Sequence, residues 1–560
     1  MQALMLAAGI GKRLGRYTKN GTKCMVQVNG KTLIEYAIES LVQNGIKKFI
    51  LVVGYKSDVL IDFINSKFNA GNLNGMQIEF IQNEIYDKTN NIYSLFIARE
   101  RLCDDDTILL ESDLIYKPEL ITRLIESKDP NIAVVSRFEP WMDGTCTILD
   151  EKNNITGMVD KAAFNWAETG NYYKTVNIYK FSKDFSKNYY IPFLEAYQKA
   201  FGKNEYYEQV LKVLSFLSSS TLKGMPVSGE DWYEIDDPAD LEIAENRFAD
   251  SSKKLSLLEQ RQGGYWRFPK LKDFCNPVNP YFPPQKMVDE LQASFKTLLT
   301  HYPSGTEQIS LLAGKIFNIL PENIIAGNFT ADEIQKALQE QNAKTELLVN
   351  PDNPSGNFLK KEEVLSLLDK LKKENTTLIF DESFIDFADR AIRYTLLDQK
   401  IIEKYDNLIV VKSISKSYGI TGLRLGVLAT KSTAYINKIR QTNSIWNINS
   451  FAEYSLQIFE KYKASYTAAC DSIAKERSRF VKELSQIPWI QVYPSQANFV
   501  LCRLVSGHTA EELAVKLLEK NIFIKVLTKE KGFDDPECIR LAVRDTDDNN
   551  LLIDALKQLD

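Results

Sequence analysis

The 560-residue sequence predicts an α/β protein made of two successive units. In residues 1–248, short apolar runs such as "KFILVVGY" alternate with helical patterns such as "TLIEYAIESLVQNG", which predicts a mostly parallel sheet covered by helices. The charged, small-residue stretch at 249–262 is typical of a linker. Residues 263–560 return to strands that end in polar loops, such as "TTLIFDES". A chain of this length with 44% apolar residues can bury more than one core.

The composition excludes several classes of partner. A net charge of -5 with both signs interspersed gives no broad basic surface, so we expect no polymeric nucleic acid as partner. No run approaches the ~20 apolar residues that a membrane helix needs, and the opening lacks a basic leader, so we expect a cytoplasmic protein without membrane insertion. Seven scattered cysteines without a CxxC pair indicate reduced thiols. Because there are only two histidines, proton transfer should fall to lysine, carboxylate or water.

The opening stretch "LMLAAGIGKRLG" predicts a strand that runs into a glycine-rich turn. Gly9 and Gly11 would let backbone N–H groups approach phosphate oxygens, and Arg13 and Lys23 add positive charge. The spacing matches neither the dinucleotide GxGxxG pattern nor the Walker pattern. The glycines alone are equally compatible with a purely structural turn.

Further motifs give this turn a function. Together with "VNGKTLIEYAIESL", "NNIYSL", "LLESDLIY" and "WMDGT", it resembles the nucleotidyltransferase family of sugar-phosphate and phosphocholine cytidylyltransferases. The resemblance is closest to the choline-phosphate branch and its 2-aminoethylphosphonate relatives, and it covers nearly the whole first half. It implies CTP as substrate, Mg²⁺ bound by Asp113 and Asp236, and catalytic roles for Arg13 and Lys23. The nucleotide-binding residues that it implies are Leu6, Ala7, Ala8, Gly9, Gly11, Arg13, Lys23, Asn90, Asn91 and Ser94.

The predicted chemistry suits these residues. Mg²⁺ takes one or two carboxylates plus phosphate oxygens and keeps much of its water. An acceptor oxygen would attack the α-phosphorus of CTP in line while pyrophosphate leaves, and no general base is required. Alternatives remain for both acids: Asp113 could be a solvated loop residue, and Asp236 a helix N-cap, although Asp237 is the better candidate for that cap.

An amine on the acceptor would need either an acid or an aromatic cage, because cations bind well over aromatic faces. The candidate substrate-binding residues are Trp141, Asp143, Tyr173 and Trp232. A primary ammonium favours Asp143, whereas a quaternary ammonium favours the tryptophans. Each aromatic residue could instead belong to the core, so the sequence leaves open whether the acceptor is 2-aminoethylphosphonate or phosphocholine.

In the second half, "SISKSYGITGLRLG" places Lys416 between hydroxyl side chains. A lysine that binds pyridoxal phosphate needs a carboxylate for the ring nitrogen, a donor for the ring oxygen and groups that hold the phosphate. Asp381 and Asn353 can serve the ring, and Ser413 and Arg424 the phosphate. The order and spacing of these residues resemble the fold-type I aminotransferases, in which the lysine also moves the α-proton of the substrate.

The subfamily resemblance is to histidinol-phosphate aminotransferase and threonine-phosphate decarboxylase, through "NPVNPYFPP", "SIWNINSFAEYSL", "ANFVL" and "IRLAVRDTDDN". It implies that Arg540 binds the carboxylate of an amino-acid substrate, which suits a bidentate guanidinium. It also implies that Tyr281 reaches the cofactor phosphate of a neighbouring subunit, and therefore a homodimer formed through this half. A surface ion pair for Arg540 and simple packing for Tyr281 are the alternatives.

Two positions depart from this pattern. Phe384 stands where these enzymes commonly have a tyrosine that donates to the ring oxygen, which leaves Asn353 to serve alone. The sequence also passes directly from Asn328 to Phe329, where a strand, a helix and the aromatic ring that stacks on the cofactor are expected. We favour residues omitted from the sequence near 328/329 over an inactive second half.

The two halves together resemble bifunctional 2-aminoethylphosphonate cytidylyltransferase–transaminases. On this hypothesis the second half moves an amino group from an amino acid to phosphonoacetaldehyde, giving 2-aminoethylphosphonate. The first half converts that product and CTP into CMP-2-aminoethylphosphonate and pyrophosphate. The alternatives are a phosphocholine or phosphoethanolamine cytidylyltransferase fused to a pyridoxal phosphate-dependent decarboxylase, and a second half that is a non-catalytic dimerisation domain.

Overall fold

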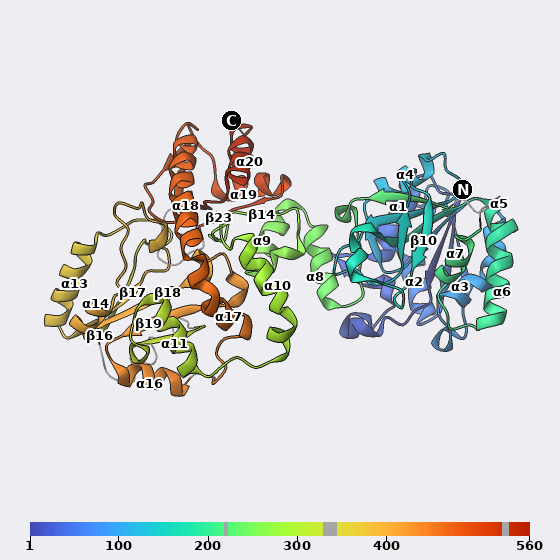
Figure 1. The fold of residues 1–560 in the computed structure, drawn as a ribbon. Coiled ribbons are helices and arrows are strands. Elements are labelled where there is room, and N and C mark those ends of the chain that lie inside the picture. Colours follow the sequence, from blue (N-terminus) through green and yellow to red (C-terminus); the bar gives the residue numbers. More distant parts are fainter. Residues whose placement is uncertain (218–221, 329–343, 443, 529–536, 560) are drawn as a thin grey trace. The chain divides into compact units, whose positions relative to one another are not determined.

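The computed structural model describes residues 1–217, 222–328, 344–442, 444–528 and 537–559. These residues form two compact units that divide between Leu257 and Leu258, inside the stretch 249–262 that is expected to link them. Helix α9 (Ser251–Arg261) lies across this division. Each unit combines helices with β-sheet (Figure 1), so the predicted α/β fold class is confirmed. Among the described residues, no helix has both the length and the apolar character needed to cross a membrane.

The first unit is built on a nine-stranded mixed sheet. Seven strands follow one another across it in the order β10 (Ile155–Val159), β9 (Cys146–Leu149), β11 (Tyr172–Phe181), β6 (Thr107–Glu111), β1 (Gln2–Ala7), β4 (Lys48–Val53) and β5 (Gln77–Gln82). Strand β8 (Ile132–Arg137) pairs with β11 and, in parallel, with β12 (Lys223–Val227). Strands β6, β1, β4 and β5 run parallel, whereas β11 is antiparallel to its neighbours.

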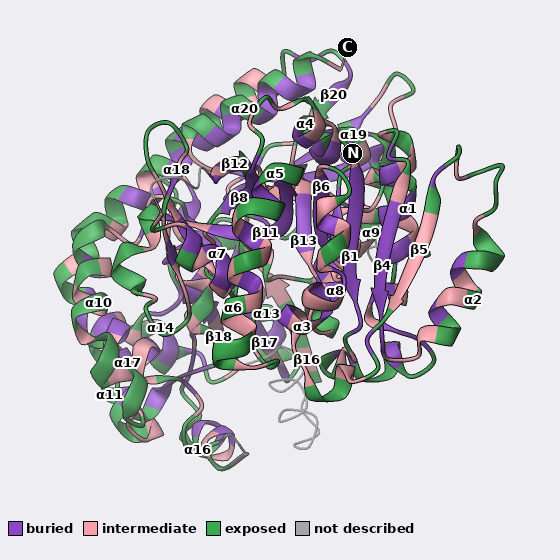
Figure 2. Ribbon diagram, turned by 90° about the vertical axis from the view of Figure 1, so that its right-hand side faces the viewer, coloured by how far each residue is buried: buried purple, intermediate pink, exposed green. Residues whose placement is uncertain are grey.

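Helices cover both faces of this sheet, because its central strands are apolar on both sides. All six residues of β1 are buried, and alternate residues pack into two separate cores: Ala3 and Met5 into one, Leu4 and Leu6 into the other. Figure 2 shows β1 and β4 almost wholly buried in the middle of the unit. The covering helices are α1 (Leu33–Gln43), α2 (Ser57–Lys67), α3 (Asn91–Ile97), α4 (Glu119–Glu126), α5 (Lys183–Phe185), α6 (Ile191–Phe201), α7 (Glu208–Leu214) and α8 (Pro238–Arg247).

The loops that matter for function follow the carboxyl ends of the parallel strands, which lie at one edge of the sheet. The glycine-rich turn follows β1, and Asp113 follows β6. A small antiparallel pair, β7 (Leu114–Tyr116) with β13 (Trp232–Glu234), extends from the same region. This pairing places Asp113 beside Asp236, since the backbone N–H of Ile235 donates to the carbonyl of Asp113 at 2.9 Å.

The second unit contains a five-stranded sheet among its described residues. Its order is β15 (Ile324–Gly327), β19 (Gly426–Thr430), β18 (Leu408–Ser413), β17 (Thr376–Asp381) and β16 (Lys344–Val349). Strands β16, β17 and β18 run parallel, whereas β19 is antiparallel to both of its neighbours. The predicted omission near 328/329 falls between β15 and β16, where residues 329–343 lie outside the described part of the chain, and it stays a prediction.

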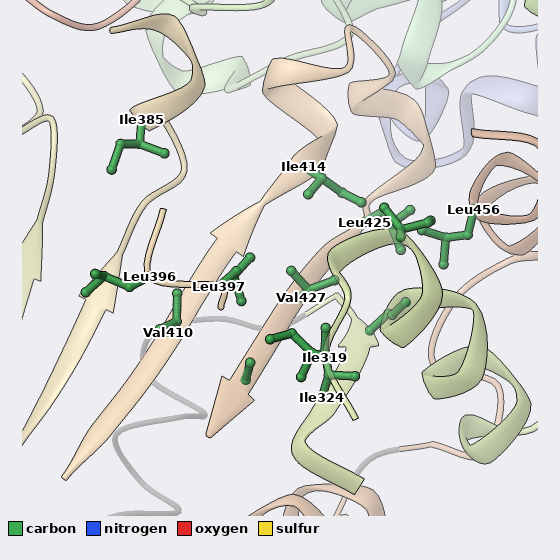
Figure 3. Close-up of a cluster of buried hydrophobic side chains, with 14 of the residues drawn as sticks. Ile319, Ile324, Ile385, Leu396, Leu397, Val410, Ile414, Leu425, Val427 and Leu456 are labelled. Carbon is green, nitrogen blue, oxygen red and sulfur yellow. The ribbon is translucent and has the colours of Figure 1, made fainter. Parts of the chain in front are cut away.

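The main core of the second unit lies on one face of this sheet. Figure 3 shows Val410 and Val427 from the strands packed with Ile319, Ile324 and Leu425. The helices of this part are α10 (Gln285–Thr300), α11 (Thr306–Phe317), α13 (Lys361–Lys373), α14 (Gln399–Lys404), α15 (Ile414–Ser417), α16 (Thr433–Thr442) and α17 (Ser450–Ile458).

A smaller layer completes the second unit. It contains a four-stranded sheet in the order β20 (Ile490–Val492), β21 (Phe499–Leu504), β24 (Cys538–Ala542) and β23 (Lys525–Val526). Strand β14 (Lys272–Asp273) pairs with β22 (Ile522–Phe523) beside it. The helices of this layer are α18 (Lys463–Leu484), α19 (Ala510–Glu519) and α20 (Thr546–Lys557).

Candidate active sites

The turn after β1 brings Lys23 close to the glycine-rich loop. Gly11 has a positive φ of 66°, and a Cβ atom there would meet the Lys23 side chain at 3.1 Å. A side chain at position 11 would therefore be strained in its backbone and would also press on Lys23. The glycine allows the loop and the lysine to approach each other.

Three carboxylates gather next to this loop. The side chains of Asp113, Glu234 and Asp236 each offer an oxygen within 4.8 Å of the others. Lys23 Nζ donates to Asp113 Oδ2 at 2.6 Å and to Asp236 Oδ1 at 2.7 Å, and Arg13 Nη2 lies 2.7 Å from Asp236 Oδ1. The helix N-cap of α8 is Asp237, as expected, so Asp236 does not serve as that cap and faces the cleft.

The pKa values of Glu234, Lys23 and Asp236 are shifted from their ordinary values. Burial, supported by Asp113 and Asp236 and opposed by Lys174, raises the pKa of Glu234 to about 7. Burial would lower the pKa of Lys23, but the two aspartates outweigh it and the net shift is upward. For Asp236, Lys23 and Arg13 outweigh burial and the pKa is lowered. The pKa values of Glu234 and Asp236 are thus shifted in opposite directions, because Lys23 and Arg13 contact Asp236 directly whereas Glu234 lies near Lys174.

The group fits a divalent cation. Asp113 Oδ1 is buried and accepts no hydrogen bond from any described residue, so the cluster has an oxygen available for a further cation. Three carboxylates beside the glycine-rich loop provide the kind of oxygen ligands that Mg²⁺ takes together with phosphate oxygens and water. Lys23 contacts the same oxygens and would have to share or release them when a metal ion binds.

A cleft of about 700 Å³ opens over this cluster. Most of the residues predicted for the first half line it, including both predicted metal ligands and one predicted substrate residue. These residues are Leu6, Ala8, Gly9, Gly11, Arg13, Lys23, Asn90, Asn91, Ser94, Asp113, Asp143 and Asp236. The structure thus brings residues together from the ends of β1 and β6, the start of α3 and the segment before α8.

The other predicted residues of the first half lie outside the lining. Ala7 is buried at the end of β1. Trp232 is 0% exposed in the core, and Trp141 stacks on Tyr233 with ring centroids 4.4 Å apart. Tyr173 in β11 lies under the Arg137 guanidinium at 4.4 Å. The three aromatic residues therefore do not form a cage in this cleft, because each ring already packs against protein.

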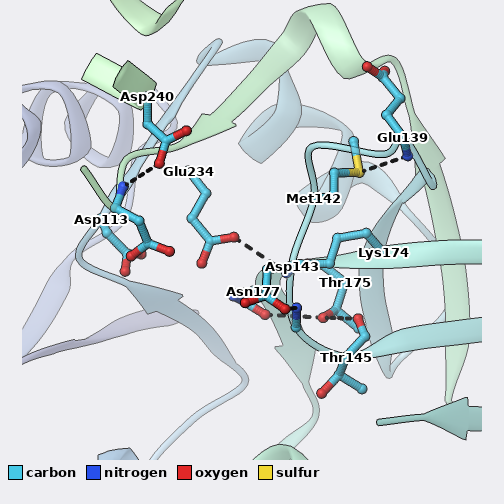
Figure 4. A network of polar contacts seen from close by, with 12 residues as sticks. Asp113, Glu139, Met142, Asp143, Thr145, Lys174, Thr175, Asn177, Glu234 and Asp240 are labelled. Atoms are coloured by element: carbon cyan, nitrogen blue, oxygen red, sulfur yellow. Dashed lines mark hydrogen bonds and ion pairs between the residues drawn. The ribbon is translucent and has the colours of Figure 1, made fainter. Parts of the chain in front are cut away.

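Sequence reasoning missed several charged residues of the cleft. Lys174 is 1% exposed; its Nζ donates to the Thr175 carbonyl at 2.6 Å and lies 3.5 Å from Glu234 Oε2. Figure 4 shows Glu234 between Asp113 and the strand that carries Lys174. Glu111 and Glu208 also line the cleft, and burial raises the pKa of each. Strand alternation was the available signal for Glu234, since residues two apart on one strand share a face and Asp236 follows at that spacing.

The second half assembles its predicted residues around Lys416. This lysine lies on α15, directly after β18, and its ammonium is 4.8 Å from the centre of the Phe384 ring. Burial lowers the pKa of Lys416; Asp381 opposes this shift, while Arg540 and Arg424 add to it. The shifts show that these charges lie near the lysine.

Hydrogen bonds fix the groups around this lysine. Asp381 Oδ1 accepts from the Ser383 backbone at 2.9 Å, and the Ser383 hydroxyl accepts from the Ser413 backbone at 2.8 Å. Arg540 donates to Asn353 Oδ1 and to the carbonyl of Cys275.

Two predicted residues lie toward the margin of this group. Arg424 is exposed, has a positive φ of 56° and reaches Asn328 Oδ1 at 3.5 Å. Tyr281 is half-buried, and Thr546, Glu476 and Asp545 affect its pKa, so its hydroxyl lies close to these residues.

These residues fit pyridoxal phosphate. A lysine with a lowered pKa lies near a strand-end carboxylate, an asparagine, a serine and two arginines, which are the donor types that the ring nitrogen, ring oxygen and phosphate need. When bound, the cofactor supplies an electron-accepting ring for reactions at an amino carbon. Asp381, Asn353, Ser413 and Arg424 would hold it, and Lys416 would bind it and carry the proton.

Comparison with known proteins agrees with this division. Residues 3–150 match the family described as MobA-like NTP transferase domain, and residues 301–556 match aminotransferase class I and II. A CMP-5'-(3-aminopropyl)phosphonate synthase from Streptomyces rubellomurinus is 27% identical, and the match covers 100% of this chain and 95% of that protein. An L-serine phosphate decarboxylase from Sulfurospirillum multivorans is 30% identical over 52% of this chain and 90% of that protein. Among solved structures, this chain is similar to the CTP:phosphocholine cytidylyltransferase from Streptococcus pneumoniae. The two are 22% identical with a TM-score of 0.37, and the match covers 44% of this chain and 99% of that chain.

The alignment with the Streptomyces synthase extends over 611 positions, more than the 560 residues of this chain, so that relative contains segments that this chain lacks. The relative at 30% identity covers 52% of this chain, and one family match falls in each half. The chain is therefore an enzyme that belongs, through its second half, to the aminotransferase class I and II family of fold type I and carries an NTP transferase domain before it.

Proposed function

We propose that the first half transfers CMP from CTP to an aminoalkylphosphonate, with 2-aminoethylphosphonate as the first acceptor to test, and releases pyrophosphate. The observation that carries this proposal is one cleft in which Arg13 and Lys23 lie against a three-carboxylate cation site, with the buried Lys174 beyond it. The name of the Streptomyces relative, which covers the full chain, supports a phosphonate acceptor.

The reaction follows from these charges. A phosphonate oxygen attacks the α-phosphorus of CTP, the bond between the α-phosphorus and its bridging oxygen breaks, and pyrophosphate leaves with the electron pair. Arg13 and Lys23 bind the triphosphate and stabilise the charge that builds up on it. Mg²⁺ held by Asp113, Glu234 and Asp236 would supply further charge neutralisation. The attacking oxygen is already ionised, so no residue has to remove a proton from it.

Lys174 supplies the cation that the acceptor needs. Its ammonium is almost fully buried, and it contacts a neutral carbonyl at 2.6 Å and Glu234 at 3.5 Å. A lysine ammonium has three N–H donors, and a doubly charged phosphonate is a suitable partner for one of them. Lys174 would therefore hold the phosphonate beside the metal site, where its oxygen faces the α-phosphorus.

The second half would supply the amine. In the leading form, it transfers an amino group from an amino-acid donor to phosphonoacetaldehyde, which gives 2-aminoethylphosphonate. Lys416 would move the α-proton, and Arg540 would bind the carboxylate of the donor. We expect this half to act as a homodimer, with Tyr281 reaching the partner's cofactor phosphate, as in the resembling subfamily.

A second candidate is decarboxylation of a phosphono-amino or phospho-amino acid. It is favoured by the 30% identity to an L-serine phosphate decarboxylase, of which the chain covers 90%. Arg540 would then bind a carboxylate that leaves as carbon dioxide. Measuring carbon dioxide release against keto-acid formation, with each substrate class in turn, distinguishes the two reactions.

The test of the first half is pyrophosphate release. Purified full-length protein is incubated with CTP, Mg²⁺ and 2-aminoethylphosphonate or 3-aminopropylphosphonate, and pyrophosphate is measured by a coupled assay. We expect release that depends on both the phosphonate and the metal. If neither phosphonate led to release of pyrophosphate, the proposed transfer would be refuted.

A further inference from the structure

The part of the cleft beyond the nucleotide loop has to accommodate the rest of the acceptor. Its lining comes from β11, from the segment that begins α7 and from β13, and it includes Lys174, Asn177, Tyr206, Glu208 and Glu234. The acceptor's phosphonate must lie beside the metal ligands, because its oxygen attacks there. The amino end of the molecule therefore points toward the remaining residues of this lining.

The lining does not provide an aromatic cage. Within the described residues, Tyr86 and Tyr206 are the aromatic side chains that line the cleft, and Tyr206 is 55% exposed. A trimethylammonium group has no N–H donor and depends on several aromatic faces around it. A primary ammonium instead has three N–H donors and prefers carboxylate oxygens. The cleft offers carboxylates, so its chemistry suits a primary amine.

Most of the carboxylates in the lining already have partners. Asp143 lies 2.7 Å from Lys161 Nζ, and Asp160 lies 2.5 Å from Lys212 Nζ. Glu111 Oε1 accepts from the Asn91 amide at 3.1 Å. The three acids of the metal cluster are engaged by Lys23, Arg13 and Lys174.

Outside the three-acid cluster, Glu208 is the lining acid whose carboxylate has a buried oxygen without a hydrogen-bond partner among the described residues. The residue is only 7% exposed, and its Oε2 accepts no hydrogen bond from any described residue. A buried carboxylate oxygen without a partner is costly, so an oxygen of this kind in a cleft indicates a site for a donor that arrives with the ligand. Glu208 comes from a different element than the three proposed metal ligands: it begins α7, directly after Tyr207, whose N–H donates to Asn91 Oδ1 at 3.1 Å.

Lys174 lines this space together with Glu234 and Glu208. It lowers the pKa of both Glu234 and Glu208, and it is therefore close to both carboxylates. An acceptor whose phosphonate contacts Lys174 would therefore have Glu208 among its neighbouring carboxylates. Lys174 offers a cation to the phosphonate, and Glu208 offers an anion to the ammonium group, so the charges of the lining complement those of a short aminoalkylphosphonate.

We propose that Glu208 binds the ammonium group of the acceptor and thereby selects primary aminoalkylphosphonates over choline-type and amine-free acceptors. This inference rests on the proposed transfer of CMP to a phosphonate. It assigns the amine-binding role to a residue that lies more than a hundred positions along the chain from the nucleotide-binding asparagines, not to the tryptophans near Asp143.

The test compares two acceptors on the same preparation. For wild type and Glu208→Gln, kcat/KM is measured with 2-aminoethylphosphonate and with ethylphosphonate, which lacks the amine. We expect wild type to prefer the amine by roughly 100-fold and Glu208→Gln to lose most of that preference, through a rise in the KM for 2-aminoethylphosphonate of about 10- to 100-fold. The KM for CTP should stay within about twofold. Because both acceptors are assayed on one sample, a partly unfolded fraction does not change the ratio.

Two further variants sharpen the result. Glu126→Gln removes an exposed carboxylate at the end of α4 and should keep the wild-type preference. Glu208→Asp keeps the charge but withdraws it by one methylene, so it should shift preference from 2-aminoethylphosphonate toward the longer 3-aminopropylphosphonate.

The outcomes separate the two proposals. If wild type releases pyrophosphate with phosphonates but Glu208→Gln keeps the wild-type preference for the amine, the role of Glu208 is refuted and the proposed function stands. If Glu208→Gln does not fold, an unchanged chain-length preference in Glu208→Asp refutes it instead. If wild type accepts no phosphonate, the proposed function fails, and the role of Glu208 fails with it.

Discussion

The two candidate sites balance their charges in opposite ways. In the first half, Lys23 contacts Asp113 and Asp236, Arg13 contacts Asp236, and further acids, among them Glu234 and Glu208, line the same cleft. In the second half, the charged groups that shift the pKa of Lys416 are one acid, Asp381, and two cations, Arg540 and Arg424. An excess of carboxylates takes up cations, whereas an excess of cations takes up anions.

The difference indicates what each site binds. The first site suits a metal ion and an ammonium group. The metal ion would bind the phosphate groups of a nucleotide, and the ammonium group would belong to an acceptor that carries a phosphonate. The second suits an anionic cofactor and a substrate with a carboxylate or phosphonate. A short aminoalkylphosphonate is compatible with both, as a product of the cationic site and a substrate of the acidic one.

The largest expected effects come from substitutions that remove the activity of one site and leave the activity of the other unchanged. Asp113→Asn removes a proposed metal ligand, and we expect it to lower kcat for the proposed CMP transfer by about 10³-fold while the second-half reaction is unchanged. Lys416→Ala should abolish the second-half reaction and leave CMP transfer within about twofold of wild type, because the lysine belongs to the other unit. Both activities are measured on each full-length variant. Loss of both activities in either variant would contradict two independent sites.

Chelation provides a control without mutation. Removal of divalent cations should stop CMP transfer, and added Mg²⁺ should restore it. The second-half reaction should continue in the presence of chelator, because its groups fit an organic anion rather than a metal. Loss of the second-half reaction in the presence of chelator would contradict the claim that only the first site binds a divalent cation.

The next effect concerns the stability of the second unit, in which β18 carries the buried Lys412 a few residues before Lys416. Lys412 is buried on β18 and lies 2.9 Å from Asp386 and 3.3 Å from Glu382, which is 0% exposed. Lys412→Met would leave buried acids without their cation, and we expect it to lower the free energy of unfolding of the second unit by about 3–5 kcal/mol. Lys372→Met removes a cation that is paired with Asp406 at the surface and should cost less than about 1 kcal/mol.

Denaturant unfolding followed by circular dichroism measures this difference, with CMP transfer assayed to show that the first unit remains folded. Equal losses in the two variants would mean that the buried pairing of Lys412 does not stabilise the unit.

A smaller effect concerns the pKa of Lys416. Burial, Arg540 and Arg424 lower this pKa, and Asp381 alone opposes them. We expect the pH at which half of the lysine reacts with pyridoxal phosphate and borohydride to lie below that of an ordinary lysine. Asp381→Asn should lower it further, since it removes the group that stabilises the ammonium. A midpoint that rises in Asp381→Asn would contradict the electrostatic arrangement described for this site.

The smallest effect is expected at Asp143. This acid lines the cleft, but its side chain is 61% exposed and paired with Lys161. Asp143→Asn should change the KM for 2-aminoethylphosphonate by less than about threefold, as is usual for an exposed pair. A rise of tenfold or more would make Asp143 the amine ligand and would remove the reason to assign that role to Glu208.

The sequence was sufficient for the fold and for the grouping of the glycine-rich loop and Asp113 in one cleft. Apolar runs such as "ALMLAAG" and "KFILVVGY" are long enough only for buried strands, and they form β1 and β4. Loops at the carboxyl ends of parallel strands meet at one edge of a sheet, so the pattern of strands alone places Gly9, Gly11 and Asp113 together.

The acceptor side could not be predicted in the same way. Lys174 lies inside a ten-residue strand that is otherwise almost entirely buried, and a pattern does not tell whether such a lysine faces a cleft. Glu208 meets the cleft only because α7 packs near Asn91, a contact between distant parts of the chain. The tryptophans suggested a cage by their chemistry, but Trp141 and Trp232 pack against each other and Tyr233.

The most direct measurement is a competition followed by phosphorus NMR. The full-length protein is incubated with CTP, Mg²⁺ and equal amounts of 2-aminoethylphosphonate and phosphocholine. We expect selective loss of the phosphonate signal, with a new phosphonate–phosphate anhydride and pyrophosphate, because the cleft has carboxylates for a primary ammonium and no cage in its described lining. Consumption of phosphocholine with the phosphonate left intact would contradict both the acceptor and its recognition by Glu208.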